Sequence, residues 1–473
     1  MSTGARVMGV TMLVVVLAAT GYVYADARDL VPGLVTLEPT PEPAAPFPTA
    51  PGAVEAPELT TALTALDPAA PEPAADRVQA LVDEMAADSR LGGEKNVSVL
   101  VTDQLTGEVV ASHRSETPRT PASTAKLVTA TAALGSVPGT STVATRVVQG
   151  DAADALVLVG GGDMMLAADA GDPDAVLGHA GLGDLARATA KDLRLRGVTS
   201  VTLTVDDSLF SGPSVNPDWD PVDLSLGYVA PVTSIAVNIA KTKAGEYVPR
   251  YADPSQHAAG VFADRLEEAG ITVEGSVRHG VASEGAAQLA EVRSAPLADV
   301  VAFFLESSDN TITEVVARLV ALDQGLPGSF DGATQAVLRV VAGMGVDTTG
   351  AHLSDASGLA RGSTLTVETL DDLLTLVVDP GRPMLRSIAA GMPIGGLTGT
   401  LADRYLESPA RGMVRAKTGS LANTSGLAGT VQDADGRQLV FAVLARTPDA
   451  WQGGARQAID AWVTQVQACG CRG

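Results

Sequence analysis

Three short segments carry side chains whose types and spacing suit nucleophilic catalysis. Ser123 and Lys126 stand three positions apart in S-T-A-K, a spacing that places both side chains on one face of a helix. The triplets Ser308-Asp309-Asn310 and Lys417-Thr418-Gly419 follow much later in the chain. An isolated S-x-x-K is more often part of a capped surface helix. Because two of the six lysines in the chain stand in these segments, the set as a whole indicates chemistry.

The chemistry assigns a role to each of five residues. A serine hydroxyl such as that of Ser123 becomes a useful nucleophile only when a neighbouring base removes its proton. Lys126 is the predicted base, and this requires its pKa to be lowered by burial and by a second cation, Lys417. Ser308 is predicted to relay a proton to the leaving amine. Asn310 is predicted to hold Lys126 and to hydrogen-bond the substrate amide.

The third segment also predicts how a substrate is held. Lys417 would attract a carboxylate, and the hydroxyls of Thr418 and Ser420 would donate to it. Gly419 would permit close approach along a strand edge. The oxyanion formed during acyl transfer needs two backbone N–H donors, and we predict that these are the amides of Ser123 and Ser420.

Composition limits the class of protein. The 473 residues are enough for two or three domains, and 46% apolar with 3% aromatic residues predicts a core built mainly from Ala, Val and Leu. The net charge of −23 argues against binding to nucleic acids or anionic membranes, which requires clustered Lys and Arg. Cys469 and Cys471 are too close for an unstrained disulfide and receive no catalytic role. The five histidines form no metal-ligand motif; they are His113, His179, His257, His279 and His352.

The first 75 residues predict a targeting segment and a linker. Residues 7–25 carry no charge and follow Arg6, so residues 1–27 resemble a secretory signal with a small-residue cleavage site near Ala25 and Ala27. The same stretch is long enough to cross a bilayer as an uncleaved anchor. Both interpretations stay open, and both place the rest of the chain outside the cytoplasm. Residues 28–75 are rich in Pro and Ala and predict an extended tether.

Helical and strand patterns alternate after the tether and predict an α/β fold. The first helix is predicted to begin at Asp76 as its cap. Residues 96–112 predict two strands around a turn at Gly107, and Asp435–Gly436 predicts a hairpin between two apolar runs. Gly160–Gly162 end a buried strand and lack the spacing of a phosphate-binding loop. An amphipathic helix is predicted over 455–468.

The order S-x-x-K, S-D-N, K-T-G is the signature set of penicillin-binding proteins and serine β-lactamases. From residue 76 to 468 the chain resembles one family in particular, the low-molecular-mass class C penicillin-binding proteins, which are D-alanyl-D-alanine carboxypeptidases/endopeptidases (serine peptidase family S13). The segments that carry the resemblance read LVLVGGGDMML, VDDSLFSG, YVAPVTSIAVN, SDNTITEVVAR, DASGLARGSTLT, MPIGGLTGTLADR and AKTGSLANTSGLAG. In that family the first of them usually ends in D-P-T-L, and Met164 and Met165 depart from this pattern.

The resemblance implies a transpeptidase-like α/β domain, in which helices flank a five-stranded antiparallel sheet and Ser123 begins a central helix. This domain would comprise residues 76–147 plus 290–473, around an inserted domain at 148–289. The 308 − 123 = 185 residues between the first two motifs leave room for that insertion. The resemblance also places Arg361 near the active site as a substrate-binding residue, and Asp206 and Phe210 in an outer substrate pocket.

The implied activity is hydrolysis of peptidoglycan stem peptides that end in D-Ala-D-Ala, through an acyl-enzyme on Ser123, with no metal or other cofactor. β-Lactams mimic this dipeptide and would acylate the same serine. Carboxypeptidase and endopeptidase activities share the acylation chemistry, so both stay open. Two alternatives remain: a serine β-lactamase, and a non-catalytic cell-wall protein that binds stem peptides.

Overall fold

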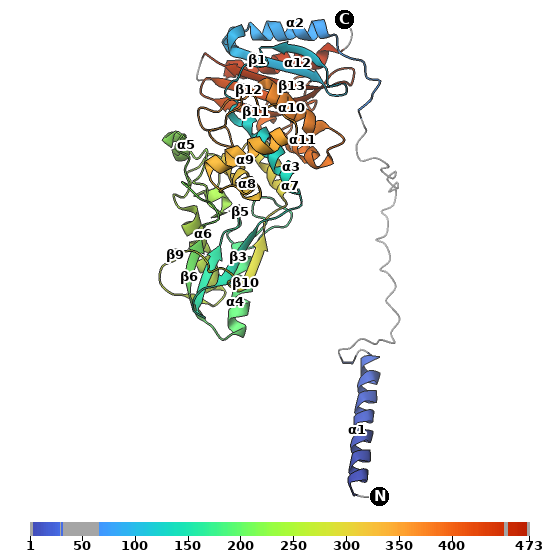
Figure 1. Cartoon of the computed structure of the whole chain (residues 1–473), viewed down its shortest axis with the longest axis vertical. Coiled ribbons are helices and arrows are strands. Elements are labelled where there is room, and N and C mark those ends of the chain that lie inside the picture. Colours follow the sequence, from blue (N-terminus) through green and yellow to red (C-terminus); the bar gives the residue numbers. More distant parts are fainter. Residues whose placement is uncertain (1–2, 29, 32–65, 449–452, 471–473) are drawn as a thin grey trace. The chain divides into compact units, whose positions relative to one another are not determined.

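The computed structural model describes residues 3–28, 30–31, 66–448 and 453–470, and the chain divides into two compact units, residues 1–64 and 65–473 (Figure 1). In the first unit, helix α1 (Thr3–Asp26) contains the segment predicted to be a signal or an anchor. Within the described part of the chain, no helix combines the length and apolarity needed to cross a membrane. Most of the predicted tether, residues 32–65, lies outside the described residues.

The second unit contains the expected five-stranded antiparallel sheet, in the order β11-β12-β13-β1-β2. The predicted hairpin turn at Asp435–Gly436 joins β12 to β13, and Gly436 has the left-handed φ of +88° that this turn requires. Gly107 lies in the turn between the other predicted pair. The strands are β1 (Val97–Asp103), β2 (Val109–His113), β11 (Val414–Leu421), β12 (Thr424–Gln432) and β13 (Gln438–Arg446).

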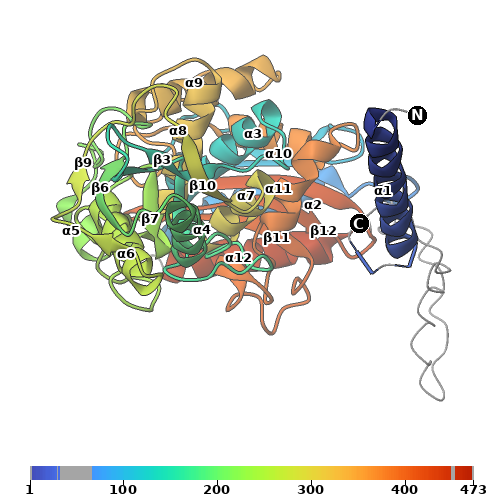
Figure 2. The same ribbon diagram turned by 90° about the horizontal axis from the view of Figure 1, so that it is seen from below.

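Helices cover both faces of this sheet, which is why β13 reads as a continuous apolar run. Alternate residues enter two cores: Phe441 and Val443 pack with α2 and α12, whereas Ala442 and Leu444 pack with α3 and α10. Figures 1 and 2 show α12 on one side of the sheet and α3 and α10 on the other. The helices are α2 (Ala75–Ala86), α3 (Lys126–Ser136), α7 (Leu297–Ser307), α8 (Asn310–Asp323), α9 (Phe330–Gly343), α10 (Val367–Val378), α11 (Arg386–Gly391) and α12 (Gly453–Cys469).

The start of the folded unit differs from the prediction. Ala74 occupies the cap position of α2 and Asp76 lies in the first turn, where its charge favours the helix N-terminus without capping it. Residues 66–74 pack on the folded unit, because Ala70 is buried and its carbonyl accepts a 2.8 Å hydrogen bond from Arg437 Nη1. The segment before α2 is therefore anchored and is not part of a free tether.

A second sheet has the order β10-β3-β4-β6-β8, with β9 also paired to β6, and α4 and α6 pack on it. In this sheet Ala144, the first residue of β3, pairs with Arg293, the last residue of β10, so we propose 144–293 for the inserted domain that we expected at 148–289. The elements of this region are β3 (Ala144–Gln149), β4 (Ala155–Val159), β5 (Asp163–Leu166), α4 (Leu182–Leu195), β6 (Ser200–Asp206), α5 (Pro221–Ser225), β7 (Ile235–Val237), α6 (Pro254–Glu268), β8 (Thr272–Val273), β9 (Arg278–His279) and β10 (Gln288–Arg293).

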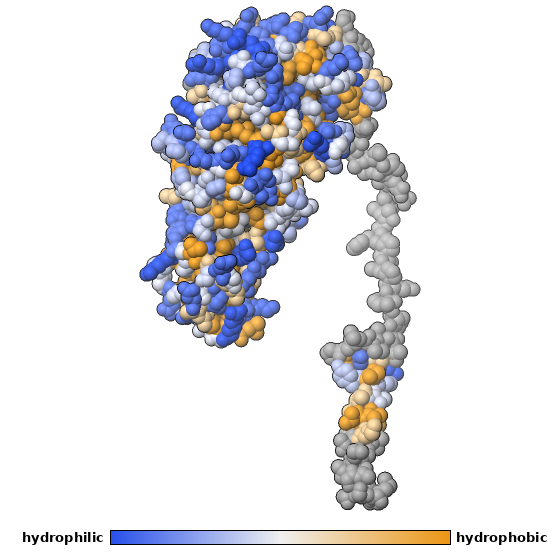
Figure 3. All heavy atoms as spheres, viewed as in Figure 1, coloured by the Kyte–Doolittle hydropathy of each residue, from blue (hydrophilic) through white to orange (hydrophobic). Residues whose placement is uncertain are grey.

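A large apolar core extends from the inserted region to the helices beside the five-stranded sheet. In it, Met164 and Trp219 of the inserted region pack with Ile312 of α8 and Phe330 of α9. On the face seen in Figure 3, apolar patches gather at the level of α7, α8 and α9. The 3-10 turns are η1 (Ser89–Leu91), η2 (Glu94–Asn96), η3 (Ala122–Ala125), η4 (Asn238–Ala240), η5 (Pro383–Leu385) and η6 (Gly399–Leu401).

One buried carboxyl group lies between α10 and the sheet. Thr102 on β1 donates a 2.9 Å hydrogen bond to Asp371 Oδ2, while Asp371 Oδ1 is buried without a partner. Burial raises the pKa of Asp371 to about 7. The folded protein therefore holds this proton more tightly than the unfolded chain does.

Asp371→Asn is expected to stabilise the protein at pH 8 and to have little effect at pH 4. A raised folded pKa means that stability is lost as pH rises from the unfolded value near 4 to the folded value near 7, and asparagine avoids that loss. The gain above pH 7 should be up to about 4 kcal/mol, since each pKa unit corresponds to about 1.4 kcal/mol. Thermal melting from pH 4 to pH 8 measures it, and a difference independent of pH would contradict this cause.

Candidate active site

We had predicted that Ser123 begins an α-helix, but it lies on a short turn just before one. It belongs to the 3-10 turn η3, and α3 begins three residues later at Lys126. Ala122 has a φ of +47°, a left-handed conformation that is costly for a non-glycine residue. Such strain persists only where the surroundings impose it, and it is frequent at functional sites.

Two glycines hold this turn in place. A Cβ on Gly419 of β11 would lie 2.6 Å from the Pro121 carbonyl oxygen, and one on Gly358 would lie 1.9 Å from that of Ala122. β11 and the loop around Gly358 therefore both pack closely against the turn that carries Ser123. Gly419, predicted to allow the approach of a substrate, allows the approach of the Ser123 turn to β11.

The Lys126 amine is fully buried and contacts three acceptors. Its Nζ donates to Ser123 Oγ at 3.0 Å, to Asn310 Oδ1 at 2.6 Å and to the Ser357 carbonyl at 2.8 Å. Burial lowers the pKa of Lys126 to about 8, although nearby carboxylates oppose the shift. Lys126 is therefore close enough to Ser123 to take its proton, and its proton affinity is suited to neutral pH.

The S-D-N triplet joins two helices. Ser308 follows α7 in the left-handed region with a φ of +59°, and the side chain of Asp309 caps α8 by accepting a 2.9 Å hydrogen bond from the Ile312 amide. This junction aims Ser308 at Lys417, whose Nζ donates to Ser308 Oγ at 2.9 Å. It aims Asn310 at Lys126. The middle residue of the motif is thus a helix cap that orients the other two.

Lys417 is also fully buried, and the charge interactions differ from our prediction. Burial lowers the pKa of Lys417 well below its usual value, and the nearby Lys126 lowers it further. We had expected burial and the charge of Lys417 together to lower the pKa of Lys126, but Lys417 is not among the causes of that shift. Burial is the leading cause at both lysines, and the carboxylates around Lys126 account for its smaller shift.

β11 presents an open edge beside these residues. At its start the edge is covered, because the Ala416 amide donates to the Pro393 carbonyl at 3.0 Å and the Gly395 amide donates to the Val414 carbonyl at 2.9 Å. Backbone groups of an edge strand point outward at every second residue, so the amides of Thr418 and Ser420 point to the same edge. An extended peptide can pair there as an additional strand.

The hydroxyls on β11 already have partners in the protein. Thr418 Oγ1 lies 2.9 Å from Thr400 Oγ1, and Ser420 Oγ accepts a 3.3 Å hydrogen bond from Arg456 Nη2. These two side chains are half-buried, in contrast to the fully buried Lys417. A ligand on this edge would meet them together with the outward amides.

Arg361 is not in contact with the motif residues. Its side chain is 78% exposed, and its Nη2 lies 3.7 Å from Asp220 Oδ2. It stands at the end of the loop that carries Ser357, the acceptor for Lys126. The structure thus places Arg361 on the surface and not among the buried groups, and its role in substrate binding stays a prediction.

Asp206 and Phe210 do not approach the motif residues. The Phe210 ring lies 5.4 Å from the Arg318 guanidinium, two turns along α8 from Asn310, and the Asp206 carboxylate accepts hydrogen bonds from Ser208 and from the Ala282 amide. Both residues have structural partners here. Their place in an outer substrate pocket stays a prediction.

Two buried acids behind Lys126 were not predicted from the sequence. Glu314 lies one turn after Asn310 on α8, and Asp355 lies in the DASG segment just before Ser357; both are fully buried. The four-residue spacing from Asn310 to Glu314 was a signal for a shared helix face. Nothing local in the sequence indicated that Asp355 would come close to Lys126.

A cavity of about 250 Å³ lies along the other side of α8. Ile312, Val315 and Leu319 contribute to its apolar wall, and none of the motif residues lines it. The helix thus separates this cavity from Asn310 and Glu314. Among the residues that the structure describes, no group of His, Cys, Asp and Glu is arranged to hold a metal ion; Cys469 is a buried thiol, and Cys471 lies outside the described residues.

Comparison with known proteins agrees with this geometry. Residues 78–249 and 239–466 match the model of the D-Ala-D-Ala carboxypeptidase 3 (S13) family. Carboxypeptidase DacB of Mycolicibacterium smegmatis is 35% identical over 479 aligned residues, which cover 99% of this chain and 97% of that protein. A carboxypeptidase of Mycobacterium tuberculosis is 37% identical over 410 residues, which cover 84% and 85%.

The solved structures show the same fold. Penicillin-binding protein 4 (dacB) of Haemophilus influenzae superposes with a TM-score of 0.68 at 21% identity, covering 82% of this chain and 99% of that one. The architecture is therefore the penicillin-binding-protein/β-lactamase-like α/β fold that the sequence predicted.

Proposed function

The chain belongs to the D-Ala-D-Ala carboxypeptidase 3 (S13) family of serine peptidases, and on that premise we propose that it cleaves peptidoglycan stem peptides that end in D-Ala-D-Ala, through an acyl-enzyme on Ser123. The observation that carries the proposal is the 3.0 Å hydrogen bond between the buried Lys126 amine and Ser123 Oγ. Endopeptidase cleavage of cross-links would follow from the same acylation step.

In the proposed acylation, a neutral Lys126 takes the proton of the Ser123 hydroxyl while Oγ attacks the carbonyl carbon of the penultimate D-alanine. With a pKa of about 8, roughly a tenth of Lys126 is neutral at pH 7. Three acceptors around Nζ favour the ammonium form at rest, so one proton leaves before attack. The lowered pKa keeps this step accessible at neutral pH.

The remaining groups complete the reaction. The oxyanion accepts hydrogen bonds from the amides of Ser123 and Ser420, and the substrate pairs with the open edge of β11. Ser308, held by Lys417 at 2.9 Å, acts as a relay: it passes its proton to the leaving nitrogen as the C–N bond breaks and D-alanine departs, and it receives in return the proton that Lys126 took from Ser123. Water then hydrolyses the ester, which restores Ser123. The terminal carboxylate of the substrate lies near Lys417, Thr418 and Ser420, with Arg361 at the border.

The proposed location is outside the cytoplasm, where the substrate is found. Residues 7–25 support this as a secretory signal or as an anchor to the membrane. The predicted partners are stem peptides, with β-lactams as acylating inhibitors.

Intact-protein mass after a short incubation with benzylpenicillin tests the proposal. One added drug equivalent that persists for minutes on the wild type, and is absent from Ser123→Ala, is the expected result. Released D-alanine from a synthetic peptide ending in D-Ala-D-Ala should accompany it.

Other outcomes have definite meanings. Rapid consumption of the drug without a lasting adduct would indicate a β-lactamase. An adduct without any D-alanine release would indicate a protein that binds stem peptides but does not cleave them. Folded protein with no adduct would reject the acyl-enzyme mechanism.

A further inference from the structure

A carboxylate of α8 is tied to the loop that holds Lys126. Glu314 Oε1 accepts a 2.7 Å hydrogen bond from the Ser357 amide, and Oε2 accepts a 3.2 Å bond from the Ala356 amide. The carbonyl of the same Ser357 accepts the 2.8 Å bond from Lys126 Nζ. Glu314 is thus linked to the catalytic amine through one residue of the loop.

α8 therefore holds Lys126 in two ways. Asn310 contacts the amine directly at 2.6 Å, and Glu314, one turn further on the same face, contacts it through Ser357. A shift of the loop would move the Ser357 carbonyl and would leave one proton of the amine without its acceptor. Displacements of about 1 Å in such sites cost large factors in rate.

Asp355 fixes the other side of the loop. It accepts hydrogen bonds from the Gly358 and Ala360 amides at 2.7 Å and from Trp219 Nε1 at 2.8 Å. Trp219 comes from the inserted region, and Asn216 of that region donates to the Ser354 carbonyl at 2.9 Å. Hydrogen bonds therefore connect residues 354–357 of the loop both to α8 and to the inserted region.

We propose that Glu314 is a positioning residue for Lys126: it holds the Ser357 carbonyl on the amine, and its charge controls how readily Lys126 accepts the Ser123 proton. This inference rests on the proposed acylation of Ser123. Glu314 does not contact the reacting atoms and acts through Lys126.

The charged groups around Glu314 and Lys126 support the proposed effect of the Glu314 charge on Lys126. Lys126 is faced by the carboxylates of Asp355, Glu314 and Asp309, and Lys417 lies nearby. Burial and the charge of Asp355 raise the pKa of Glu314, whereas the hydrogen bonds from Ser357 and Ala356 lower it, and Arg318 is the other cation that senses Glu314. Both carboxylate oxygens of Glu314 accept hydrogen bonds from backbone N–H groups, which favours the ionised form, and this charge favours the ammonium form of Lys126.

The test is the pH dependence of the benzylpenicillin acylation rate, from pH 5.5 to pH 9, for the wild type and Glu314→Gln. Glutamine presents an amide N–H to one of the two backbone amides, so the maximal rate is expected to fall about tenfold. Where Glu314 is ionised, glutamine also removes a negative charge that favours the ammonium form of Lys126, so the acidic limb of the pH–rate profile is expected to move down by about 0.5–1 pH unit. Asp323→Asn is the matched control, because it removes the same charge from an exposed position of the same helix and should change neither quantity.

A second variant separates position from charge. Trp219→Phe removes one donor to Asp355 and keeps an aromatic ring against Phe330, whose centroid lies 5.2 Å away. It is expected to slow acylation about fivefold without moving the acidic limb, and it tests the loop even if Glu314→Gln does not fold.

The outcomes separate this inference from the proposed function. An unmoved limb in folded Glu314→Gln would reject the role of the charge, and a wild-type rate in Trp219→Phe would reject the role of the loop. Wild-type protein that is labelled while both variants behave as wild type overturns the inference alone. Wild-type protein that is not labelled overturns both proposals.

Discussion

Lys126→Met is expected to slow acylation of Ser123 by benzylpenicillin about 10³–10⁴-fold while the protein stays folded. Methionine fills the space of the fully buried side chain but cannot take a proton. It also removes the three hydrogen bonds that the amine donates to Ser123, Asn310 and Ser357. The substitution also costs stability, because Asn310 Oδ1 and the Ser357 carbonyl lose their donor, so the rate is measured on protein shown to be folded.

The rate of adduct formation at pH 8, followed by intact mass over minutes to hours, measures this effect. Lys191→Met on the exposed face of α4 is the control and should label at the wild-type rate. Thermal melting of both variants checks the fold. Labelling of Lys126→Met within tenfold of the wild type would mean that another group takes the Ser123 proton.

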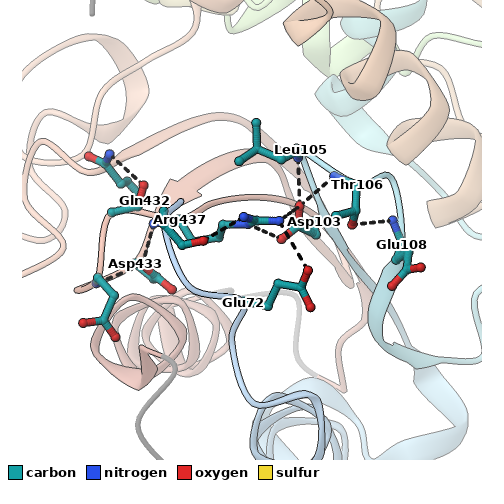
Figure 4. A network of polar contacts seen from close by, with 11 residues as sticks. Glu72, Asp103, Leu105, Thr106, Glu108, Gln432, Asp433 and Arg437 are labelled. Carbon is teal, nitrogen blue, oxygen red and sulfur yellow. Dashed lines mark hydrogen bonds and ion pairs between the residues drawn. The ribbon is translucent and has the colours of Figure 1, made fainter. Parts of the chain in front are cut away.

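Arg437→Met is expected to lower the free energy of unfolding by about 3–5 kcal/mol, the second large effect. Arg437 and Asp103 are both almost fully buried, and the guanidinium contacts the carboxylate through Nε at 2.5 Å and Nη2 at 2.9 Å (Figure 4). Without the arginine, Asp103 keeps hydrogen bonds from the Leu105 and Thr106 amides but no cation. A buried carboxylate without its counter-ion is costly.

The same arginine anchors the segment before α2. Its Nη1 donates to the Ala70 carbonyl at 2.8 Å, and Glu72 Oε1 lies 4.0 Å from Nη2 (Figure 4). Arg437→Met should therefore also make residues 66–74 more sensitive to proteolysis.

Urea unfolding at pH 7 tests this prediction against two further variants. Arg382→Met breaks a surface pair, 3.7 Å from Asp379, and should cost at most about 1 kcal/mol. The double variant Asp103→Asn/Arg437→Met removes the unpaired charge and should recover part of the loss. A loss in Arg437→Met no larger than that in Arg382→Met would show that the buried pair contributes little.

The sequence alone determined the chemical identity of the site. S-x-x-K needs only a local helical turn to bring Ser123 to Lys126, and the order of three motifs carries information that no single motif does. The hairpin at Asp435–Gly436 was predictable for the same reason, since two adjacent residues set the turn. The strands and the closing helix followed from their apolar periodicity.

Only the tertiary structure decided what depends on burial and on distant contacts. The lowered pKa of Lys126 arises because other parts of the fold exclude water from it. The strain at Ala122 arises because β11 and the loop at Gly358 press on the Ser123 turn. Glu314 and Ser357 are 43 residues apart in the chain, so their contact depends on how a loop docks on α8. Local patterns specify turns and motifs, whereas the desolvation of Lys126 and its contacts with residues far away in the chain exist only once the whole domain is packed.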